Sequence, residues 1–441
     1  MKVAAVIAEY NPFHTGHQYH LSKTRELTGA DYILVLMSGD FVQRGAPALL
    51  NKYTRTRMAL LGGADVVIEL PTLYAVSSAE YFAQGAVEFA GHLGVVDILS
   101  FGSESGSLET LTRAASTLLS CENESASLLR PMLKEGLSYP AAKEKLFTML
   151  LSSCKDTENL FTLPNNILGV EYCRALLSQN SSIVPFTITR QGNDFHDTGF
   201  HDSSASFISA AAIRNFVKSC PCGSSDEDAY TKNFEKISEY LPAESHALFI
   251  DAMKTGSFLV EDDLSEILYY KLLREMEQGF SMYLDCTPDL SDKIIKYLPE
   301  YTGYTAFCSL LKSKDLTYAR ISRVLLHILL DIKTPGFYKD NYGERKYSLP
   351  FGRLLGFRKS ASPLLSSLKK NSLIPLVTKL ADAKNSFTGD ALDFFKKELF
   401  YASIYEAVSA AKVNNKMLHE SSQTQKKTAL NEFRQSPVIV P

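Results

Sequence analysis

Two kinds of apolar pattern alternate along the first two hundred residues, and this order limits the possible folds. Short runs rich in β-branched residues predict five strands, at Val3 to Ile7, Tyr32 to Met37, Asp65 to Leu70, Val95 to Phe101 and Ile183 to Thr189. Apolar residues at helical spacing predict helices between them, around His17 to Leu27, Lys52 to Leu61 and Ala79 to Leu93, and within Leu108 to Leu151. The alternation favours βαβ units and a parallel sheet that binds ligands at the carboxyl ends of its strands.

After Ser209 the pattern changes to long amphipathic helices, with repeats of helical spacing at Glu266 to Met276 and Tyr318 to Leu330. A chain of 441 residues is longer than one hydrophobic core usually supports. We therefore expect an α/β fold with a Rossmann-like domain over residues 1–218 and a mainly α-helical region over residues 219–441. A loop is expected at Cys220 to Asp228, and the polar tail from Ser421 onward is expected to be frayed.

The composition is that of an ordinary globular protein, with 45% apolar and 22% charged residues. No apolar stretch is long enough to span a membrane, and the amino terminus does not resemble a cleavable signal, so we expect a cytoplasmic protein. Seven scattered cysteines suit free thiols. Neither Cys220-Pro-Cys222 nor the pairs His196-Asp197 and His201-Asp202 have the spacing of a metal site, so no protein-held metal is expected.

The residues after the first expected strand carry the most informative chemical motif, His14-Thr-Gly-His17. The first N–H groups of a helix are unpaired and the local dipole is positive, so anionic oxygens bind there. Two imidazoles at that point can donate hydrogen bonds to phosphate, while Gly16 leaves room for a ribose or a base. The four residues alone fit a chance loop equally well; the strand before them and the helix after them favour a nucleotide site.

Further polar residues follow the other expected strands, at Met37 to Asp40, at Phe101 to Glu104 and at Thr189-Arg190. Gly102 would allow close approach of a ligand, and Arg190 could bind phosphate or sugar oxygens. In Ile208-Ser-Ala-Ala-Ala-Ile-Arg214, a serine at a helix start and an arginine one to two turns later can reach the same phosphates. The alternative is that Ser209 is only a helix cap and Arg214 a surface residue.

The charge is unevenly distributed. Residues Leu311 to Leu380 contain 14 lysines and arginines against four acidic residues, an excess of +10 in a chain whose net charge is −3, so the remainder carries −13. Such asymmetry is typical of a protein that binds a polyanion through one region, although a solvated basic helix face would give the same count. Gly352 to Ser360 looks superficially like a phosphate-binding loop, but its glycine is not adjacent to its lysine and no strand is expected before it.

The two motifs at His14 to His17 and Ile208 to Arg214 resemble those of the nucleotidyltransferase superfamily, which attacks the α-phosphate of ATP and releases pyrophosphate. Additional segments make the chain similar to the bacterial tRNA(Met) cytidine acetate ligase family. These segments are Gly39 to Gly45, Lys52 to Leu60, Gly63 to Pro71, Phe101 to Glu104, Pro164 to Tyr172, Tyr318 to Arg323 and Leu354 to Phe357.

The resemblance implies a nucleotidyltransferase-like, ATP-binding catalytic domain over residues 1–218. It implies that acetate is activated as acetyl-adenylate and transferred to N4 of the wobble cytidine, C34, of elongator tRNA(Met), with release of AMP and pyrophosphate. His14, His17 and Arg214, with Mg²⁺, would screen the phosphate charge. The implied ATP site comprises Ile7, Ala8, Glu9, Tyr10, Asn11, Pro12, Phe13, His14, Thr15, Gly16, His17, Gln18, Tyr19, His20, Gly102, Asn165 or Asn166, Arg190 and Ser209.

The basic segment 311–380 would bind tRNA, and its candidate residues are Arg320, Arg323, Arg353, Arg358 and Lys359. No protein partner is inferred. Thr15 and Asp40 depart from the asparagines that the family pattern leads us to expect, and Asp40 would add negative charge near the phosphates. Two other functions remain open: a small-molecule adenylyltransferase that transfers AMP to a phosphate ester, and a catalytically silent RNA-binding protein.

Overall fold

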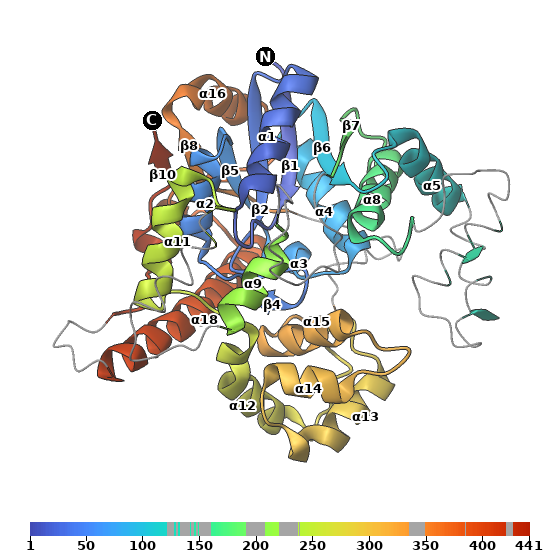
Figure 1. Ribbon diagram of the computed structural model, residues 1–441, viewed down its shortest axis with the longest axis vertical. Coiled ribbons are helices and arrows are strands. Elements are labelled where there is room, and N and C mark those ends of the chain that lie inside the picture. Colours follow the sequence, from blue (N-terminus) through green and yellow to red (C-terminus); the bar gives the residue numbers. More distant parts are fainter. Residues whose placement is uncertain are drawn as a thin grey trace.

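The structure, a computed structural model, describes residues 1–120, 160–190, 208–219, 239–334, 349–383, 385–419 and 427–441, with single positions between 128 and 149 and at 237. Its centre is an eight-stranded sheet in the order β10-β8-β5-β2-β1-β6-β7, with β9 beside β8 (Figure 1). The five strands predicted from the sequence are confirmed and pair in parallel with one another. They are β1 (Val3–Ala8), β2 (Tyr32–Ser38), β5 (Val66–Leu70), β6 (Ile98–Ser103) and β7 (Val184–Thr189).

Helices cover both faces of the sheet because alternate side chains of each strand point to opposite faces. Val3, Leu34 and Ile68 pack against one helical layer, whereas Ile33 and Val67 pack against the other. The first layer contains α4 (Ala79–His92), α5 (Leu108–Ser120), α8 (Pro164–Ser178) and α16 (Ser362–Asn371). The second layer contains α1 (Thr15–Thr28), α2 (Lys52–Leu61), α9 (Ala210–Ser219) and α11 (Ala243–Thr255). The short helix α3 (Thr72–Ala75) follows β5.

Three strands come from the part of the chain after residue 218 and join the same sheet: β8 (Gly352–Arg358), β9 (Leu376–Val377) and β10 (Val438–Val440). β8 runs antiparallel to β5. The segment that superficially resembled a phosphate-binding loop is therefore a strand, and the tail expected to be frayed ends in one. Gly356 allows this pairing, because a Cβ there would lie 2.6 Å from the carbonyl oxygen of Val438.

The remaining C-terminal elements form the helical region that the sequence predicted. α12 (Ser265–Glu275), α13 (Pro288–Tyr297), α14 (Tyr304–Leu311) and α15 (Tyr318–Leu329) enclose a separate core that includes Leu268 and Leu325. The long helix α18 (Gly389–His419) lies between this unit and the sheet (Figure 1), where the Tyr405 hydroxyl donates to the Ala48 carbonyl at 2.8 Å. Short elements complete the chain: η1 (Glu261–Leu264), η2 (Leu298–Glu300), η3 (Lys359–Ala361), α17 (Leu380–Ala383) and η4 (Glu432–Arg434).

A small hairpin joins the helical unit to the loops at the end of β2. Its strands are β3 (Phe41–Val42) and β4 (Ala46–Pro47). Gly45, in the turn, adopts a φ of 76°, and a Cβ at this position would lie 2.3 Å from the backbone nitrogen of Arg323 in the middle of α15. The Gly45 carbonyl accepts hydrogen bonds from the hydroxyls of Tyr304 and Ser322, both at 2.8 Å. Only glycine fits this contact, which fixes the hairpin against the helical unit.

Two smaller expectations can be compared with the structure. None of the helices in the described part of the chain has the length and apolar character needed to cross a membrane. Cys173, Cys286 and Cys308 are buried free thiols. The other four cysteines, the loop at 220–228 and the two His-Asp pairs lie outside the described residues.

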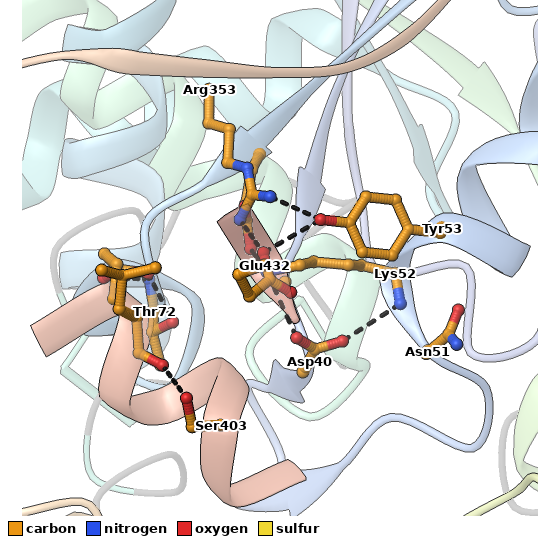
Figure 2. A network of polar contacts seen from close by, with 12 residues as sticks. Asp40, Asn51, Lys52, Tyr53, Thr72, Arg353, Ser403 and Glu432 are labelled. Atoms are coloured by element: carbon orange, nitrogen blue, oxygen red, sulfur yellow. Dashed lines mark hydrogen bonds and ion pairs between the residues drawn. The ribbon is translucent and has the colours of Figure 1, made fainter. Parts of the chain in front are cut away.

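A buried cluster of charges links the carboxyl end of the chain to the loop after β2, to the start of α2 and to β5 (Figure 2). The Lys52 Nζ lies 3.3 Å from Asp40 Oδ2, 2.9 Å from Glu69 Oε1 and 3.5 Å from Glu432 Oε1. The guanidinium of Arg353 contacts Glu432 at 2.5 Å and Glu69 at 3.4 Å. Burial lowers the pKa of Lys52, but the three surrounding carboxylates outweigh it and raise that pKa well above its usual value. Asp40 therefore has a fixed counter-ion.

Replacement of Lys52 with methionine should be strongly destabilising, because three buried carboxylates would lose their shared cation. We expect a loss of about 3–5 kcal/mol in the free energy of unfolding, measured by urea denaturation. Lys396→Met is the matched control, since that side chain is 64% exposed, and its effect should stay within about 0.5 kcal/mol. Equal effects of the two substitutions would show that the cluster does not stabilise the fold.

Candidate functional site

A cleft of about 290 Å³ lies at the carboxyl ends of β1, β6 and β7. Most residues of the predicted nucleotide site line it: Ile7, Ala8, Glu9, Tyr10, Asn11, His14, Gly16, His17, Tyr19, His20, Gly102, Asn165, Arg190, Ser209 and Arg214. The strand order places the topological switch between β1 and β6, since the chain leaves β1 in one direction and returns on its other side. The cleft is thus where a doubly wound sheet is expected to bind its ligand.

The two histidines form the start of α1 and thereby fix their own ring orientation. The Gly16 N–H donates to His14 Nδ1 at 3.0 Å, and the His14 N–H donates to His17 Nδ1 at 3.3 Å. A ring nitrogen that accepts a hydrogen bond carries no proton, so a neutral ring must carry its proton on Nε2. The two rings lie side by side, with centroids 3.8 Å apart. Each presents an Nε2–H donor in the cleft at a helix N-terminus.

The histidines are neutral in the free protein at physiological pH. Burial lowers the pKa of His14 to about 3, with Arg190 and Arg214 contributing in the same direction. Burial also lowers the pKa of His17 well below its usual value and that of His20 to about 4. Desolvation is the main cause in all three rings, because an imidazolium would lose its hydration without gaining a counter-ion. An arriving polyanion would supply that counter-ion.

The start of α9 supplies a second set of polar groups to the cleft. The Ser209 Oγ accepts a hydrogen bond from the Ala212 N–H at 3.1 Å, so this residue caps the helix and also lines the cleft. Arg214 Nη1 donates to the Asn11 carbonyl at 2.6 Å. Burial lowers the pKa of Arg214, and Arg44 acts in the same direction. The alternative that Arg214 is a surface residue is wrong, since this guanidinium is held inside the cleft.

A chain of hydrogen bonds on the β6 and β7 side of the cleft orients the guanidinium of Arg190. Asn165 Nδ2 donates to Glu104 Oε1 at 2.6 Å, and Arg190 Nη1 donates to Asn165 Oδ1 at 3.2 Å. Glu104 also accepts from the Asn166 N–H at 2.8 Å, so it caps the start of α8. Asn165 lines the cleft, whereas the buried Asn166 accepts from the Ser105 N–H at 3.0 Å and braces the loop after β6.

Four residues of the expected ATP site, besides Asn166, do not line the cleft. Phe13 is fully buried and packs in the core beneath Gly62, and Pro12 precedes it outside the cleft. Thr15 and Gln18 face away along α1 and contribute to a shallow groove on its other side. A helix exposes successive residues in different directions, so a continuous motif cannot place all its side chains in one cavity.

Sequence reasoning missed two groups of cleft residues. Phe82, Phe101, Leu168 and Tyr172 form an apolar wall, and nothing in the sequence distinguishes them from ordinary core positions. Gln43 and Arg44, in the β3–β4 hairpin, also line the cleft. Both residues follow the predicted end of the second strand by a few positions, which is where ligand-binding residues are expected, but the sequence did not predict the hairpin that carries them.

Asp40 does not face the phosphate-binding groups, contrary to the expectation from the sequence. Its carboxylate is paired with Lys52 and accepts the Lys52 backbone N–H at 3.1 Å. The asparagine that was expected here would leave Lys52 with one fewer counter-ion.

The structure does not bring the five candidate tRNA-binding residues together. Arg353 is only 11% exposed and belongs to the buried charge cluster, so it is not available to a phosphate. Arg358 ends β8, which runs antiparallel to β5, so it lies at the amino-terminal ends of the parallel strands and away from the cleft. Its Nε donates to the Leu60 carbonyl at 2.9 Å, and Lys359 follows it. Arg320 and Arg323, by contrast, lie in α15, which contacts the hairpin that lines the cleft.

Acidification should destabilise the ligand-free protein through His14. Its pKa is about 6.5 in an unfolded chain and about 3 in the fold, so the unfolded state binds more protons between these values. The stabilisation present above pH 6.5 is therefore lost as the pH falls toward 3. His14→Asn keeps a helix-capping side chain but removes this titration. Its melting temperature should fall less steeply between pH 7 and 4.5, and parallel decreases in both proteins would contradict the assignment.

Comparisons with known proteins agree with this architecture. A family model described as HIGH Nucleotidyl Transferase matches residues 1–421. The tRNA(Met) cytidine acetate ligase of Clostridium novyi (strain NT) is 35% identical over 385 residues, which cover 87% of this chain and 92% of the relative. The protein of the same name from Clostridium perfringens (strain SM101 / Type A) is 35% identical over 431 residues, or 95% of this chain and 98% of that protein.

Two solved structures extend the similarity to three dimensions. The apo form of Thermotoga maritima TmcAL is 30% identical and superposes with a TM-score of 0.84, with all of both chains covered. The structure of the same protein bound with alpha-thio ATP is 29% identical and gives a TM-score of 0.80, with 100% of this chain and 99% of that chain covered.

Proposed function

This chain belongs to the HIGH nucleotidyl transferase family, alongside the tRNA(Met) cytidine acetate ligases, and we propose that it acetylates N4 of the wobble cytidine, C34, in elongator tRNA(Met). In this reaction ATP activates acetate as acetyl-adenylate, and AMP and pyrophosphate are released. Because its substrates would be ATP, acetate and tRNA, we propose that it acts in the cytoplasm.

One observation carries the proposal. His14 and His17 present two neutral imidazole Nε2–H donors at a helix N-terminus, in the same cleft as Arg190 and Arg214. These groups can hydrogen-bond to phosphate oxygens without a proton transfer, and they are preorganised in a buried site where such bonds are strong.

In the first step a carboxylate oxygen of acetate attacks the α-phosphorus of ATP, and pyrophosphate leaves on the opposite side. The developing charge on the phosphate oxygens would be met by His14, His17 and Arg214. On the β6 side Gly102, Asn165 and Arg190 would hold the nucleoside. A Cβ at Gly102 would lie 3.3 Å from Arg190 Cγ, so a side chain would narrow this part of the cleft.

The part of the chain that the structure describes does not form a site for a resident metal ion. Among the described residues there is no cluster of three or more histidine, cysteine, aspartate or glutamate side chains suited to a metal. Mg²⁺ prefers oxygen ligands and commonly binds enzymes through substrate phosphates. We propose that Mg²⁺ enters as part of the ATP substrate.

In the second step the cytidine amine attacks the acetyl carbonyl carbon and AMP leaves. The mixed anhydride is already a good acyl donor, so the enzyme's contribution is largely to hold the two reactants in position, and no covalent enzyme nucleophile is required. The target base must leave its stack to reach the cleft, which favours a single-stranded anticodon loop as the substrate.

The purified protein, incubated with ATP, labelled acetate and total tRNA, should yield labelled N4-acetylcytidine after nucleoside digestion. Product formation should require ATP and release AMP and pyrophosphate in equal amounts. Transfer of AMP to a small phosphate ester would support the adenylyltransferase alternative instead. Binding of tRNA with no turnover of ATP would support a silent RNA-binding protein.

Replacement of either motif histidine should impair adenylation specifically. His17→Asn removes one donor to the phosphates, so acetate-dependent exchange of pyrophosphate into ATP should fall by about 10²–10³-fold. Binding of tRNA, measured by filter retention, should remain unchanged. His246→Asn, in α11 and outside the cleft, is the control and should behave as the unmodified protein. An unaltered rate of pyrophosphate exchange in His17→Asn would show that His17 does not stabilise the phosphates during adenylation.

We propose that tRNA phosphates contact Arg320 and Arg323, because α15 lies beside the hairpin that borders the cleft. Arg320→Ala should weaken tRNA binding and lower the slope of log affinity against log salt by about 0.7–1. The matched control is Lys359→Ala at the far edge of the sheet, which should change neither quantity. A larger effect of the Lys359 substitution would show that tRNA binds near Lys359 instead of near α15.

A further inference from the structure

Glu9 is a carboxylate in a cleft whose other charged groups suit an anion. It directly follows β1, and its Oε1 accepts the Gln43 N–H at 2.9 Å. Its Oε2 accepts no hydrogen bond from the described residues, and Glu9 lines the cleft. A carboxylate next to a triphosphate would weaken ATP binding by repulsion. Its position therefore points to a ligand that donates hydrogen bonds.

Gln43 supplies a second unpaired group next to this carboxylate. Its side-chain Nε2 is buried and has no hydrogen-bond partner among the described residues, although Gln43 lines the cleft. A buried amide without a partner costs free energy unless a ligand pairs with it. Together Glu9 and Gln43 offer an acceptor and a donor in the same cleft.

Both residues are held in place by backbone contacts. Arg55 is fully buried, and its Nη1 donates to the Glu9 carbonyl at 2.7 Å and to the Ser38 carbonyl at 3.0 Å. The hairpin that carries Gln43 is fixed at Gly45 against α15. Since the backbone N–H of Gln43 also holds one oxygen of Glu9, the Glu9 carboxylate is fixed against the hairpin backbone that carries Gln43.

The cleft divides into two halves on either side of β1. The half that contains Gly102 and Arg190 follows β6 and β7, at the switch point where a nucleotide is expected. The half that contains Gln43 follows β2, which lies on the other side of β1 from β6 in the sheet. A ligand on this second side can face an adenylate on the first.

Cytosine has the complementary arrangement of groups. Its exocyclic N4 donates hydrogen bonds while N3 and O2 accept them, and a carboxylate that accepts from N4 is a recognised protein contact to this base. Uracil has an acceptor at O4 and a donor at N3, so it would place an oxygen against the Glu9 carboxylate. We propose that Glu9 and Gln43 form the subsite for the acceptor cytosine, with Glu9 Oε2 accepting the N4 proton and Gln43 Nε2 donating to N3 or O2.

This assignment rests on the proposed function and gives Glu9 a catalytic role in its second step. The N4 atom forms a bond to the acetyl carbonyl carbon, and the bond between that carbon and the phosphate oxygen breaks with its electron pair leaving on AMP. The proton lost from N4 passes to Glu9 Oε2 and then to solvent, which regenerates the carboxylate. Glu9 is thereby separated from the ATP-binding residues with which the sequence grouped it.

Glu9→Gln tests this division between the two steps. The substitution preserves size and keeps an oxygen that can accept the Gln43 N–H. Acetate-dependent exchange of pyrophosphate into ATP should stay at or above its original rate, while transfer of acetyl from preformed acetyl-adenylate to tRNA should fall by about 10²-fold or more. Glu9→Asp, which restores the carboxylate, should recover part of the transfer rate.

Two results would overturn the proposal. Loss of exchange in Glu9→Gln, with a raised KM for MgATP, would assign the carboxylate to ATP and its metal. Unchanged acetyl transfer in Glu9→Gln would show that the Glu9 carboxylate takes no part in the reaction. If the unmodified protein itself showed no acetate-dependent exchange and formed no acetylcytidine, the proposed function would fail instead, so the two failures are distinguishable.

A competition experiment tests base recognition without catalysis. The competitor is tRNA(Met) with uridine in place of the wobble cytidine. Its displacement of labelled tRNA(Met) from the protein, with ATP and acetate left out, gives a Kd for comparison with that of the cytidine tRNA. The unmodified enzyme should bind the uridine tRNA more weakly than the cytidine tRNA by roughly 5–150-fold, and this ratio should shrink in Glu9→Gln, whose amide can donate to O4. Gln43→Leu should weaken binding of the cytidine tRNA while leaving exchange unchanged. An unchanged ratio in Glu9→Gln, or full tRNA affinity in Gln43→Leu, would contradict the subsite.

Discussion

The hydrogen bond from the Gly16 N–H to His14 Nδ1 is the contact on which the site depends. Together with the bond from the His14 N–H to His17 Nδ1, it begins α1 and satisfies two otherwise unpaired backbone donors. The same bonds decide which nitrogen of each ring carries a proton. Helix formation and the proposed phosphate recognition thus use opposite nitrogens of the same side chains, and the donors are in place once the helix has folded.

The cleft is formed by segments that lie far apart in the sequence. The starts of helices α1 and α9 provide the groups proposed to bind phosphate, the β6 and β7 ends provide Gly102 and Arg190, and the β3–β4 hairpin provides Gln43. The hairpin also contacts the helical unit, through Gly45, and a second contact joins His327 Nε2 to the Val76 carbonyl at 2.9 Å. An RNA contact on α15 would therefore lie next to the acceptor side of the cleft, so binding and chemistry are adjacent in space although they are distant in sequence.

The buried charges show why the carboxyl-terminal segment belongs to the catalytic fold. Glu432 pairs with Lys52 and Arg353, and β10 adds to β8 only a few residues later. A buried charge that lacks its partners is costly, so the segment after residue 427 cannot detach without leaving Lys52 and Arg353 undercompensated. The tail is polar in sequence and resembled a frayed end, but the ion pairs of Glu432 and the pairing of β10 with β8 anchor it.

The sequence by itself determined the five parallel strands, the helical character of the C-terminal region and the paired histidines at the first strand-to-helix junction. These features are local, because side-chain periodicity and helix capping act within a few residues. Only the tertiary structure decided that β8 and β10 complete the sheet, that Arg353 is an internal ion-pair partner, that Phe13 and Asn166 support the cleft from outside it, and that Gln43 enters it. Each of these features depends on contacts between residues far apart in the chain. The energy of such a contact depends on how deeply both residues are buried and how their groups are oriented, which a local sequence pattern does not specify.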